Sequence, residues 1–198
     1  MVWGAYFLTA QGLLTTLWIA LVAFGGGRWL FVLRWPLVVC SILTTGYTGF
    51  LFAQGLARDL WQGWQSTVDL FAQAIVEGSA VLLLASLIPG ISDPRFARTL
   101  AATLIAAMLV HLGLIVFENL VAPHKTRHRR LAVQAICRGA FAGLFWGGAI
   151  TAAIASIVVA VVFARMPGGT GLAAVLALAG CFAWEYIWVE AGQSVPLS

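Results

Sequence analysis

Six ionisable side chains interrupt stretches of this sequence that are otherwise apolar. A charge at membrane depth is costly unless it is paired or hydrated, so each of these side chains is a candidate for a functional role. Four of them are carboxylates, and one arginine cannot neutralise all four, which points to protonated carboxyl groups or a wet cavity. The structural alternative is that the arginine pairs with one carboxylate and ties helices together. We predict a proton relay made of Asp69, Glu77, His111, Glu118, Arg138 and Glu185.

The composition explains why these charges should lie in a membrane. The chain has 198 residues, of which 62% are hydrophobic and only 9% are charged, whereas about a quarter of the residues of a soluble domain are charged. The net charge of +4 comes from basic residues in short loops. A lipid surface explains these residues without any nucleic acid.

The sequence contains few residues that could bind a metal ion or a haem. Cys40, Cys137 and Cys181 lie in separate apolar segments without CxxC spacing. An iron–sulfur cluster or a structural zinc needs about four ligands, so we expect no metal in this chain. A haem held by two histidines needs both at membrane depth. Only His111 lies there, because the other two histidines belong to a basic loop, so we expect no haem.

Six apolar segments are long enough to cross a bilayer as helices. Their short connections predict antiparallel neighbours. The fold class is therefore an all-α integral membrane bundle, with residues 1–198 forming a single transmembrane domain. The fifth segment is longer than a bilayer requires, so it should tilt, bend or protrude. We expect the spans at about residues 3–24, 33–57, 66–88, 98–121, 131–165 and 171–189.

An even number of spans places both termini on one side of the membrane. The Arg58–Asp59 turn and the loop His124–Arg130 should lie on that side as well. Four of the six ionisable residues fall in that half of the membrane, and Glu77 and His111 lie near its middle. Lys and Arg number five on each side, so the positive-inside rule gives no orientation.

Five stretches of sequence resemble a known family when they are taken in order. Residues 1–14 read MVWGAYFLTAQGLL, residues 46–61 read GYTGFLFAQGLARDLW and residues 72–84 read AQAIVEGSAVLLL. Residues 111–120 read HLGLIVFENL, and residues 185–198 read EYIWVEAGQSVPLS. Over essentially the whole chain, this series is similar to the NrfD/PsrC family, the polysulfide-reductase-type membrane anchors.

The resemblance implies a haem-free subunit of a bacterial or archaeal cytoplasmic membrane. Such a subunit exchanges electrons, through a quinone (menaquinone or ubiquinone), with a four-cluster ferredoxin-like iron–sulfur subunit that contacts a molybdopterin catalytic subunit. The family's quinone-pocket tyrosine falls on Tyr47, and Gln54 is expected to extend the polar lining. The alternative for Tyr47 is a hydrogen bond to a neighbouring helix. Docking of the iron–sulfur subunit is expected at Arg58, Asp59, Trp61 and Trp64, of which the two tryptophans could instead be plain interfacial residues.

The sequence also departs from the family pattern. Members usually have eight or more spans, and this chain resembles them from the third helix onward, so we expect another chain or segment to supply two further helices. Two other function classes stay open beside electron transfer. A proton-coupled secondary transporter would use the buried carboxylates, although no inverted repeat is visible. A purely structural membrane subunit would need none of them for chemistry.

Overall fold

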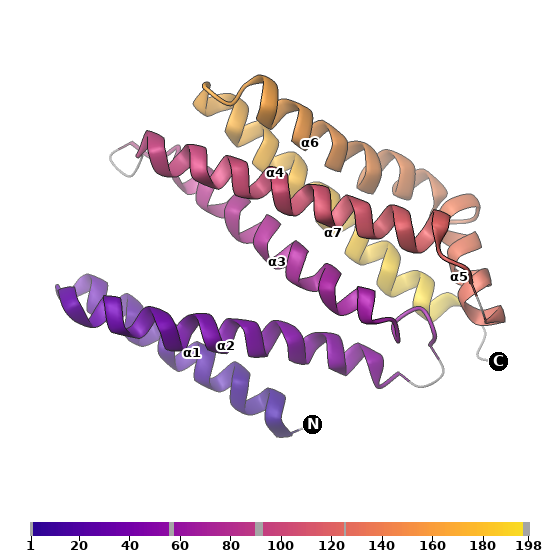
Figure 1. Cartoon of the computed structure of the whole chain (residues 1–198), viewed down its shortest axis with the longest axis horizontal. Coiled ribbons are helices and arrows are strands. Elements are labelled where there is room, and N and C mark those ends of the chain that lie inside the picture. The colour runs from indigo at the N-terminus through magenta and orange to yellow at the C-terminus, as the bar shows by residue number, and fades with distance from the viewer. Residues whose placement is uncertain (1, 56–57, 90–92, 125, 196–198) are drawn as a thin grey trace. The chain divides into compact units, whose positions relative to one another are not determined.

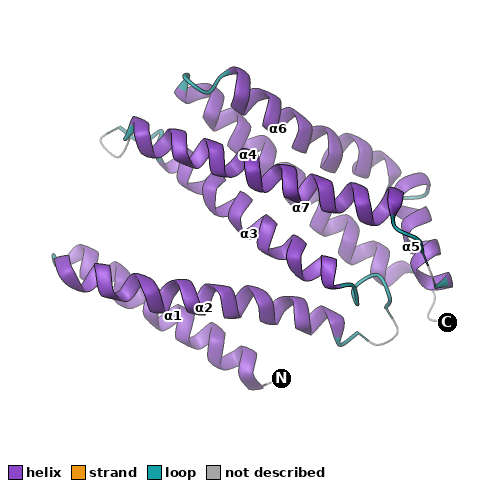
Figure 2. Ribbon diagram, in the orientation of Figure 1, coloured by secondary structure: helices purple, strands orange, loops and turns teal. Residues whose placement is uncertain are grey.

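A computed structural model of the chain describes residues 2–55, 58–89, 93–124 and 126–195 (Figure 1). Every regular element among these residues is a helix (Figure 2). The chain divides into two compact units, Met1–Gln54 and Gly55–Ser198. Six described helices are long and apolar enough to cross a membrane, which confirms the all-α membrane fold class. They are Trp3–Ala23, Gly27–Ala53, Trp64–Ala85, Pro94–Val121, Leu144–Val162 and Gly168–Ser194.

The first unit is a pair of helices joined by a glycine turn. Helix α1 (Val2–Ala23) and helix α2 (Gly27–Ala53) are connected through Gly25, whose φ of 77° favours glycine. Helix α2 begins earlier than the expected start near residue 33, so Pro36 lies inside it and not in its first turn. Interior proline is tolerated in apolar helices because neighbouring groups satisfy the carbonyl that it frees.

Gly4 is where α1 and α2 approach each other. A methyl group at Gly4 would overlap the ring of Tyr47 on α2. The Tyr47 ring also meets Phe7 edge-on, with ring centroids 6.3 Å apart. The glycine therefore allows an aromatic side chain of α2 to lie directly on the backbone of α1.

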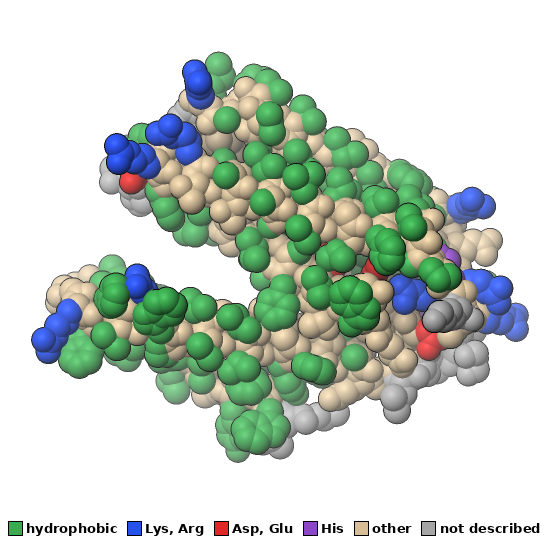
Figure 3. All heavy atoms as spheres, viewed as in Figure 1, with side chains coloured by type: hydrophobic (Ala, Val, Ile, Leu, Met, Phe, Trp, Pro, Cys, Tyr) green, Lys and Arg blue, Asp and Glu red, His purple; other side chains and the backbone are tan. Residues whose placement is uncertain are grey.

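The second unit is a helical bundle whose chain enters and leaves at the same end. Its elements are α3 (Trp64–Ala85), α4 (Pro94–Val116) with a π-helical end η1 (Phe117–Val121), α5 (Arg127–Arg138), the π-helix η2 (Leu144–Ile150) continuing into α6 (Thr151–Val162), and α7 (Pro167–Ser194). Basic side chains gather at its two ends, while apolar side chains lie along its flank (Figure 3). This distribution suits a lipid environment.

Small residues allow the helices of the second unit to pack closely. Leu83 of α3 and Leu104 and Met108 of α4 are buried against the alanines of α7, including Ala173 and Ala177. In addition, the Ser156 hydroxyl of α6 donates a hydrogen bond of 2.8 Å to the carbonyl of Ala173. Small-residue interfaces and interhelical hydrogen bonds are typical of membrane helix pairs.

The fifth predicted span is wrong in extent. Residues 131–165 were expected to form one helix, but the structure ends α5 at Arg138, and the fifth candidate span is Leu144–Val162. The break falls at Gly139, where an added methyl group would lie 2.8 Å from the backbone of Ala135. Helix α5 starts with basic residues and buries only one face, so it is a short amphipathic helix before the span. The assignment of the whole chain to a single transmembrane domain stays a prediction.

Gly4→Ala should destabilise the first unit, because the new methyl group must displace the Tyr47 ring. Overpacking of this kind costs about 1–3 kcal/mol. Gly12→Ala on the same helix is the matched control, because nothing lies within 4 Å of the added group there. Thermal unfolding in detergent, followed by circular dichroism, should show a lower midpoint for Gly4→Ala only. Equal midpoints for the two variants would contradict the packing of Tyr47 on α1.

Candidate functional site

A buried carboxylate joins three helices of the second unit. Asp69 of α3 is 6% exposed, and its Oδ1 lies 2.6 Å from Nδ1 of His111 on α4, a side chain that is 1% exposed. Its Oδ2 accepts hydrogen bonds of 3.0 Å from Gln73 Nε2, one turn along α3, and from Trp184 Nε1 of α7. Both carboxylate oxygens of Asp69 are therefore hydrogen-bonded inside the bundle.

These contacts restrict where a proton can be held. Because Oδ2 of Asp69 accepts from two N–H donors, a proton on this carboxyl group belongs on Oδ1, which faces His111. The pair can therefore pass one proton between Asp69 Oδ1 and His111 Nδ1 with little movement of either side chain.

Two more carboxylates surround this pair. Glu77 lies two turns after Asp69 on α3 and is close enough to His111 to interact with its charge. Glu185 of α7 follows Trp184 in sequence and interacts electrostatically with Glu77, His111 and Asp69. Glu77 is half-buried and Glu185 is exposed at the flank of the helix. The structure joins two of the six predicted relay residues, Asp69 and His111, by a hydrogen bond, and Glu77 and Glu185 lie within electrostatic range of them. These four residues, Asp69, Glu77, His111 and Glu185, are named here the Asp69 cluster.

Glu118 lies at the end of the bundle, seven residues after His111. It is 5% exposed within the π-helix η1, and its Oε1 lies 3.9 Å from an Nη of Arg129 at the start of α5. That oxygen has no hydrogen-bond partner among the described residues. The charge of Glu118 also interacts with that of Asp69. Glu118 is therefore within electrostatic range of the Asp69 cluster from the end of the bundle.

Two histidines lie near the start of α5. His128, predicted to lie in a basic loop, instead belongs to α5 and is 1% exposed, with no described partner for either ring nitrogen. Buried polar atoms without partners commonly bind ordered water. His124 lies in the preceding connection, where burial, and then the Arg129 guanidinium, lower its pKa below the ordinary value. It is therefore neutral near neutral pH.

Arg138 is not where the sequence placed it. It was expected about two turns inside the fifth span, but it is the exposed last residue of α5, outside Leu144–Val162. No described carboxylate lies within ion-pair distance of it. The reason is the break at Gly139, which separates α5 from the span. The structure gives Arg138 no place in the Asp69 cluster, and its relay role stays a prediction.

The predicted docking residues divide into an internal pair and an accessible pair. Arg58 donates a hydrogen bond to the carbonyl of Gly192, and Trp61 Nε1 donates to the carbonyl of Trp188 at 3.3 Å. Trp61 is 9% exposed and packs on α7, whereas Trp64 is 70% exposed and Asp59 is half-buried. Arg58 and Trp61 therefore anchor the chain to the end of α7. Trp64 and Asp59 are the members that a partner could contact.

The predicted quinone residues both belong to the first unit. Tyr47 is half-buried on α2, against Gly4 and Phe7. Thr44, one turn earlier on the same helix face, has a buried hydroxyl without a described hydrogen-bond partner. Gln54 caps the C-terminus of α2 with its backbone N–H, and its side chain is exposed. Tyr47 and Thr44 thus share a face that Gln54 only borders.

Several residues of the site were missed in the sequence. Gln73 could have been found, because it follows Asp69 by four residues and therefore lies on the same helix face. Trp184 comes from a distant helix, and nothing in its spacing links it to Asp69. Arg129 and His128 were grouped with a solvated basic loop. Across the described residues, no three His, Cys, Asp or Glu side chains converge as a metal-ligand set.

Trp184→Phe should destabilise the second unit, because it removes one of the two donors to Asp69 Oδ2. A hydrogen bond to a charged group contributes about 1.5–3 kcal/mol. Trp64→Phe is the control, since that indole is 70% exposed. Thermal unfolding in detergent should show a clear loss for Trp184→Phe and almost none for Trp64→Phe. If the two variants behave alike, the indole does not stabilise the buried carboxylate.

The comparisons with known proteins agree with this architecture. The family model described as polysulphide reductase, NrfD, matches residues 1–196. No curated protein and no solved structure matches the chain. The family match covers nearly the whole chain, including both units and every element of the Asp69 cluster. The chain therefore belongs to the NrfD polysulphide reductase family, as a multi-pass membrane protein with six candidate spans.

Proposed function

We propose that this chain is a haem-free, quinone-interacting anchor subunit of a respiratory iron–sulfur and molybdopterin oxidoreductase. It would exchange electrons between the quinone pool and a ferredoxin-like subunit. Family membership supports an anchor of polysulphide-reductase-like complexes. The observation that carries the quinone assignment is the buried Asp69–His111 hydrogen bond. Quinone chemistry moves two protons with two electrons, and this pair is built to hold a proton in an apolar bundle.

The residues around Tyr47 fit a quinone head group. A quinone presents two carbonyl acceptors on a flat ring, so it needs hydrogen-bond donors inside an apolar slot. Tyr47 carries a phenol O–H, and the buried hydroxyl of Thr44 has no described partner. The Phe7 ring lies at the edge of Tyr47 and adds an apolar wall. A bound quinone would supply a mobile carrier of two electrons and two protons.

The chain's own residues would orient the quinone and handle its protons. Tyr47 and Thr44 would donate hydrogen bonds to carbonyl oxygens, with Gln54 at the border of that face. Asp69 and His111 would hold a proton between Oδ1 and Nδ1, as their distance of 2.6 Å allows. The remaining relay members in this proposal are Glu77, Glu118, Arg138 and Glu185.

The partners follow from the same proposal. The iron–sulfur subunit would dock at the end of the second unit where Trp64 and Asp59 are accessible, beside the Arg58 and Trp61 anchor. Asp59 also lines a surface cavity of about 420 Å³ together with Arg129, which offers both charges to a partner. A molybdopterin subunit would join through the iron–sulfur subunit. Two further helices would come from another chain or segment, in a bacterial or archaeal cytoplasmic membrane.

A proton-coupled secondary transporter is the second candidate. The observation that favours it is the presence of two π-helical segments, η1 and η2, because transporter sites commonly use interrupted helices. Gentle purification separates the classes. Co-purifying iron–sulfur and molybdopterin subunits support the anchor, whereas a lone protein that takes up a substrate supports the transporter. A complex whose quinone-linked activity survives loss of every named site residue would leave only a structural role.

Tyr47→Phe should weaken quinone binding, because it removes one neutral hydrogen-bond donor. Such a bond contributes about 0.5–1.5 kcal/mol, or roughly 2- to 13-fold in affinity. We expect the KM for quinone to rise by that factor, while assembly and the dye-linked activity of the catalytic subunit stay unchanged. Tyr6→Phe is the control, because Tyr6 is an exposed tyrosine of α1. Unchanged quinone kinetics in Tyr47→Phe would overturn the assignment of this residue.

Asp69→Asn should slow proton-coupled quinone turnover while preserving the side-chain shape. The amide cannot exchange a proton with His111, so we expect quinone-linked turnover to fall by about tenfold or more, within the usual range for acid–base groups. Glu190→Gln is the control for a lost acidic group on α7. Dye-linked activity and subunit content should stay normal in both variants. Wild-type turnover of an assembled Asp69→Asn complex would remove the Asp69 cluster from the proposed relay.

A further inference from the structure

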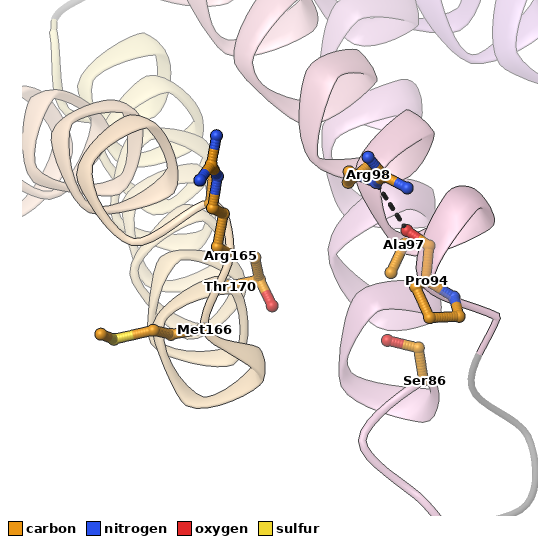
Figure 4. Close-up of a pocket in the computed structure, with 8 residues that line it drawn as sticks. Ser86, Pro94, Ala97, Arg98, Arg165, Met166 and Thr170 are labelled. Carbon is orange, nitrogen blue, oxygen red and sulfur yellow. Dashed lines mark hydrogen bonds between the residues drawn. The ribbon is translucent and has the colours of Figure 1, made fainter.

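A cavity of about 350 Å³ opens at the end of the second unit that lies away from Glu118 (Figure 4). Helices α4 and α7 begin at this end, and α3 and α6 finish there. The cavity lies between the α3–α4 pair and the turn from α6 to α7. Neither the Asp69 cluster nor the Tyr47 face contributes to it. Its residues are Ser86, Pro94, Ala97, Arg98, Ala164, Arg165, Met166 and Thr170.

Two guanidinium groups border the cavity from opposite sides. Arg98 comes from α4 and Arg165 from the turn after α6, so the positive charges are brought together from distant parts of the chain (Figure 4). The Nε of Arg98 donates to the carbonyl of Pro94 at 3.1 Å, which fixes the orientation of its guanidinium. No described acidic residue lines the cavity. The cavity is therefore positively charged on two sides.

The helix starts at this end are largely satisfied within the chain. Asp93 caps α4 by accepting from the backbone N–H of Arg95 at 2.8 Å. At the start of α7, Pro167 has no N–H, and the N–H groups of Gly169 and Thr170 donate to the carbonyl of Met166. The positive charge beside the cavity therefore comes from the two arginines.

The other residues that line the cavity indicate which kind of anion would fit there. Pro94, Ala97, Ala164 and Met166 contribute apolar surface, and the hydroxyl groups of Ser86 and Thr170 face the gap between the two helix pairs (Figure 4). The cavity lies at the ends of membrane-type helices, which is the depth of lipid headgroups. At this end of the bundle, Val161 and Val162 of α6 are exposed, and these apolar side chains could contact a lipid acyl chain. A lipid supplies both a phosphate and an apolar tail.

We propose that this cavity binds the phosphodiester headgroup of an anionic phospholipid. Arg98 and Arg165 clamp the phosphate oxygens, which guanidinium groups contact in a bidentate manner. The acyl chain would follow the apolar surface of α6, where Val161 and Val162 are exposed. The volume is within the range of about 300–1,000 Å³ that small-molecule sites occupy. This site is independent of the quinone chemistry proposed above.

The test compares lipid retention by the full chain and its variants. The protein is purified in a neutral detergent, supplied with phosphatidylglycerol or phosphatidylcholine, and examined by native mass spectrometry. Arg98→Gln combined with Arg165→Gln removes both guanidinium groups. Arg95→Gln is the matched control, because Arg95 lies in the same helix turn as Arg98 but does not line the cavity. This substitution also removes one positive charge. Inorganic phosphate is added in a separate arm as a competitor.

Wild type and Arg95→Gln should retain one phosphatidylglycerol in preference to phosphatidylcholine. Each membrane-surface arginine is expected to contribute about five-fold to anionic lipid binding, so the double variant should bind about 25-fold more weakly. Equal retention of both lipids by wild type would overturn the proposal. The proposal would also be overturned if Arg95→Gln lost as much phosphatidylglycerol binding as the double variant. Displacement of the lipid by millimolar inorganic phosphate would show a site for free phosphate, which also overturns it. Circular dichroism is used to establish that the double variant is folded. Arg98→Lys keeps the positive charge, so this variant should retain part of the phosphatidylglycerol binding.

Discussion

The hydrogen bond between Asp69 and His111 is the constraint on which the second unit depends. An ionised carboxylate in an apolar bundle is strongly destabilising unless donors surround it. Here the hydrogen-bond partners of Asp69 come from α3, α4 and α7, so these three helices must pack in one register for its carboxyl group to be satisfied. The buried carboxyl group therefore specifies how the helices meet.

The two ends of the second unit differ in chemistry. At one end, Glu118, Arg129 and His128 bury ionisable groups whose hydrogen-bonding capacity is only partly used within the described residues. Water entering there would lie on the way to the Asp69 cluster. At the other end, Arg98 and Arg165 border a cavity with apolar walls. One end therefore carries buried ionisable groups, and the other carries arginines beside apolar surface.

The sequence predicted the membrane class and the number of spans because long apolar runs are local signals, and it singled out the ionisable residues because charges are rare within those runs. It placed Asp69 near one membrane surface and His111 near the middle of the membrane, so it did not predict the direct contact between them that the structure shows. It could not find Trp184, because the indole reaches Asp69 only through the packing of α7. It misplaced Arg138 because hydropathy does not register the break at Gly139, which depends on backbone geometry. It also treated Trp61 as a surface residue, although Gly192 makes room for that ring on α7.

In the proposed function, the Asp69–His111 pair gains or loses a proton when the quinone changes its redox state. Infrared difference spectroscopy of the intact complex, recorded as the quinone is reduced, measures this directly. Histidine labelled with ¹⁵N and the Asp69→Asn variant assign the bands. We expect a carboxyl band and an imidazole band that shift together on reduction and are lost together in Asp69→Asn. A wild-type difference spectrum in which quinone bands change while both of these bands stay constant would contradict it.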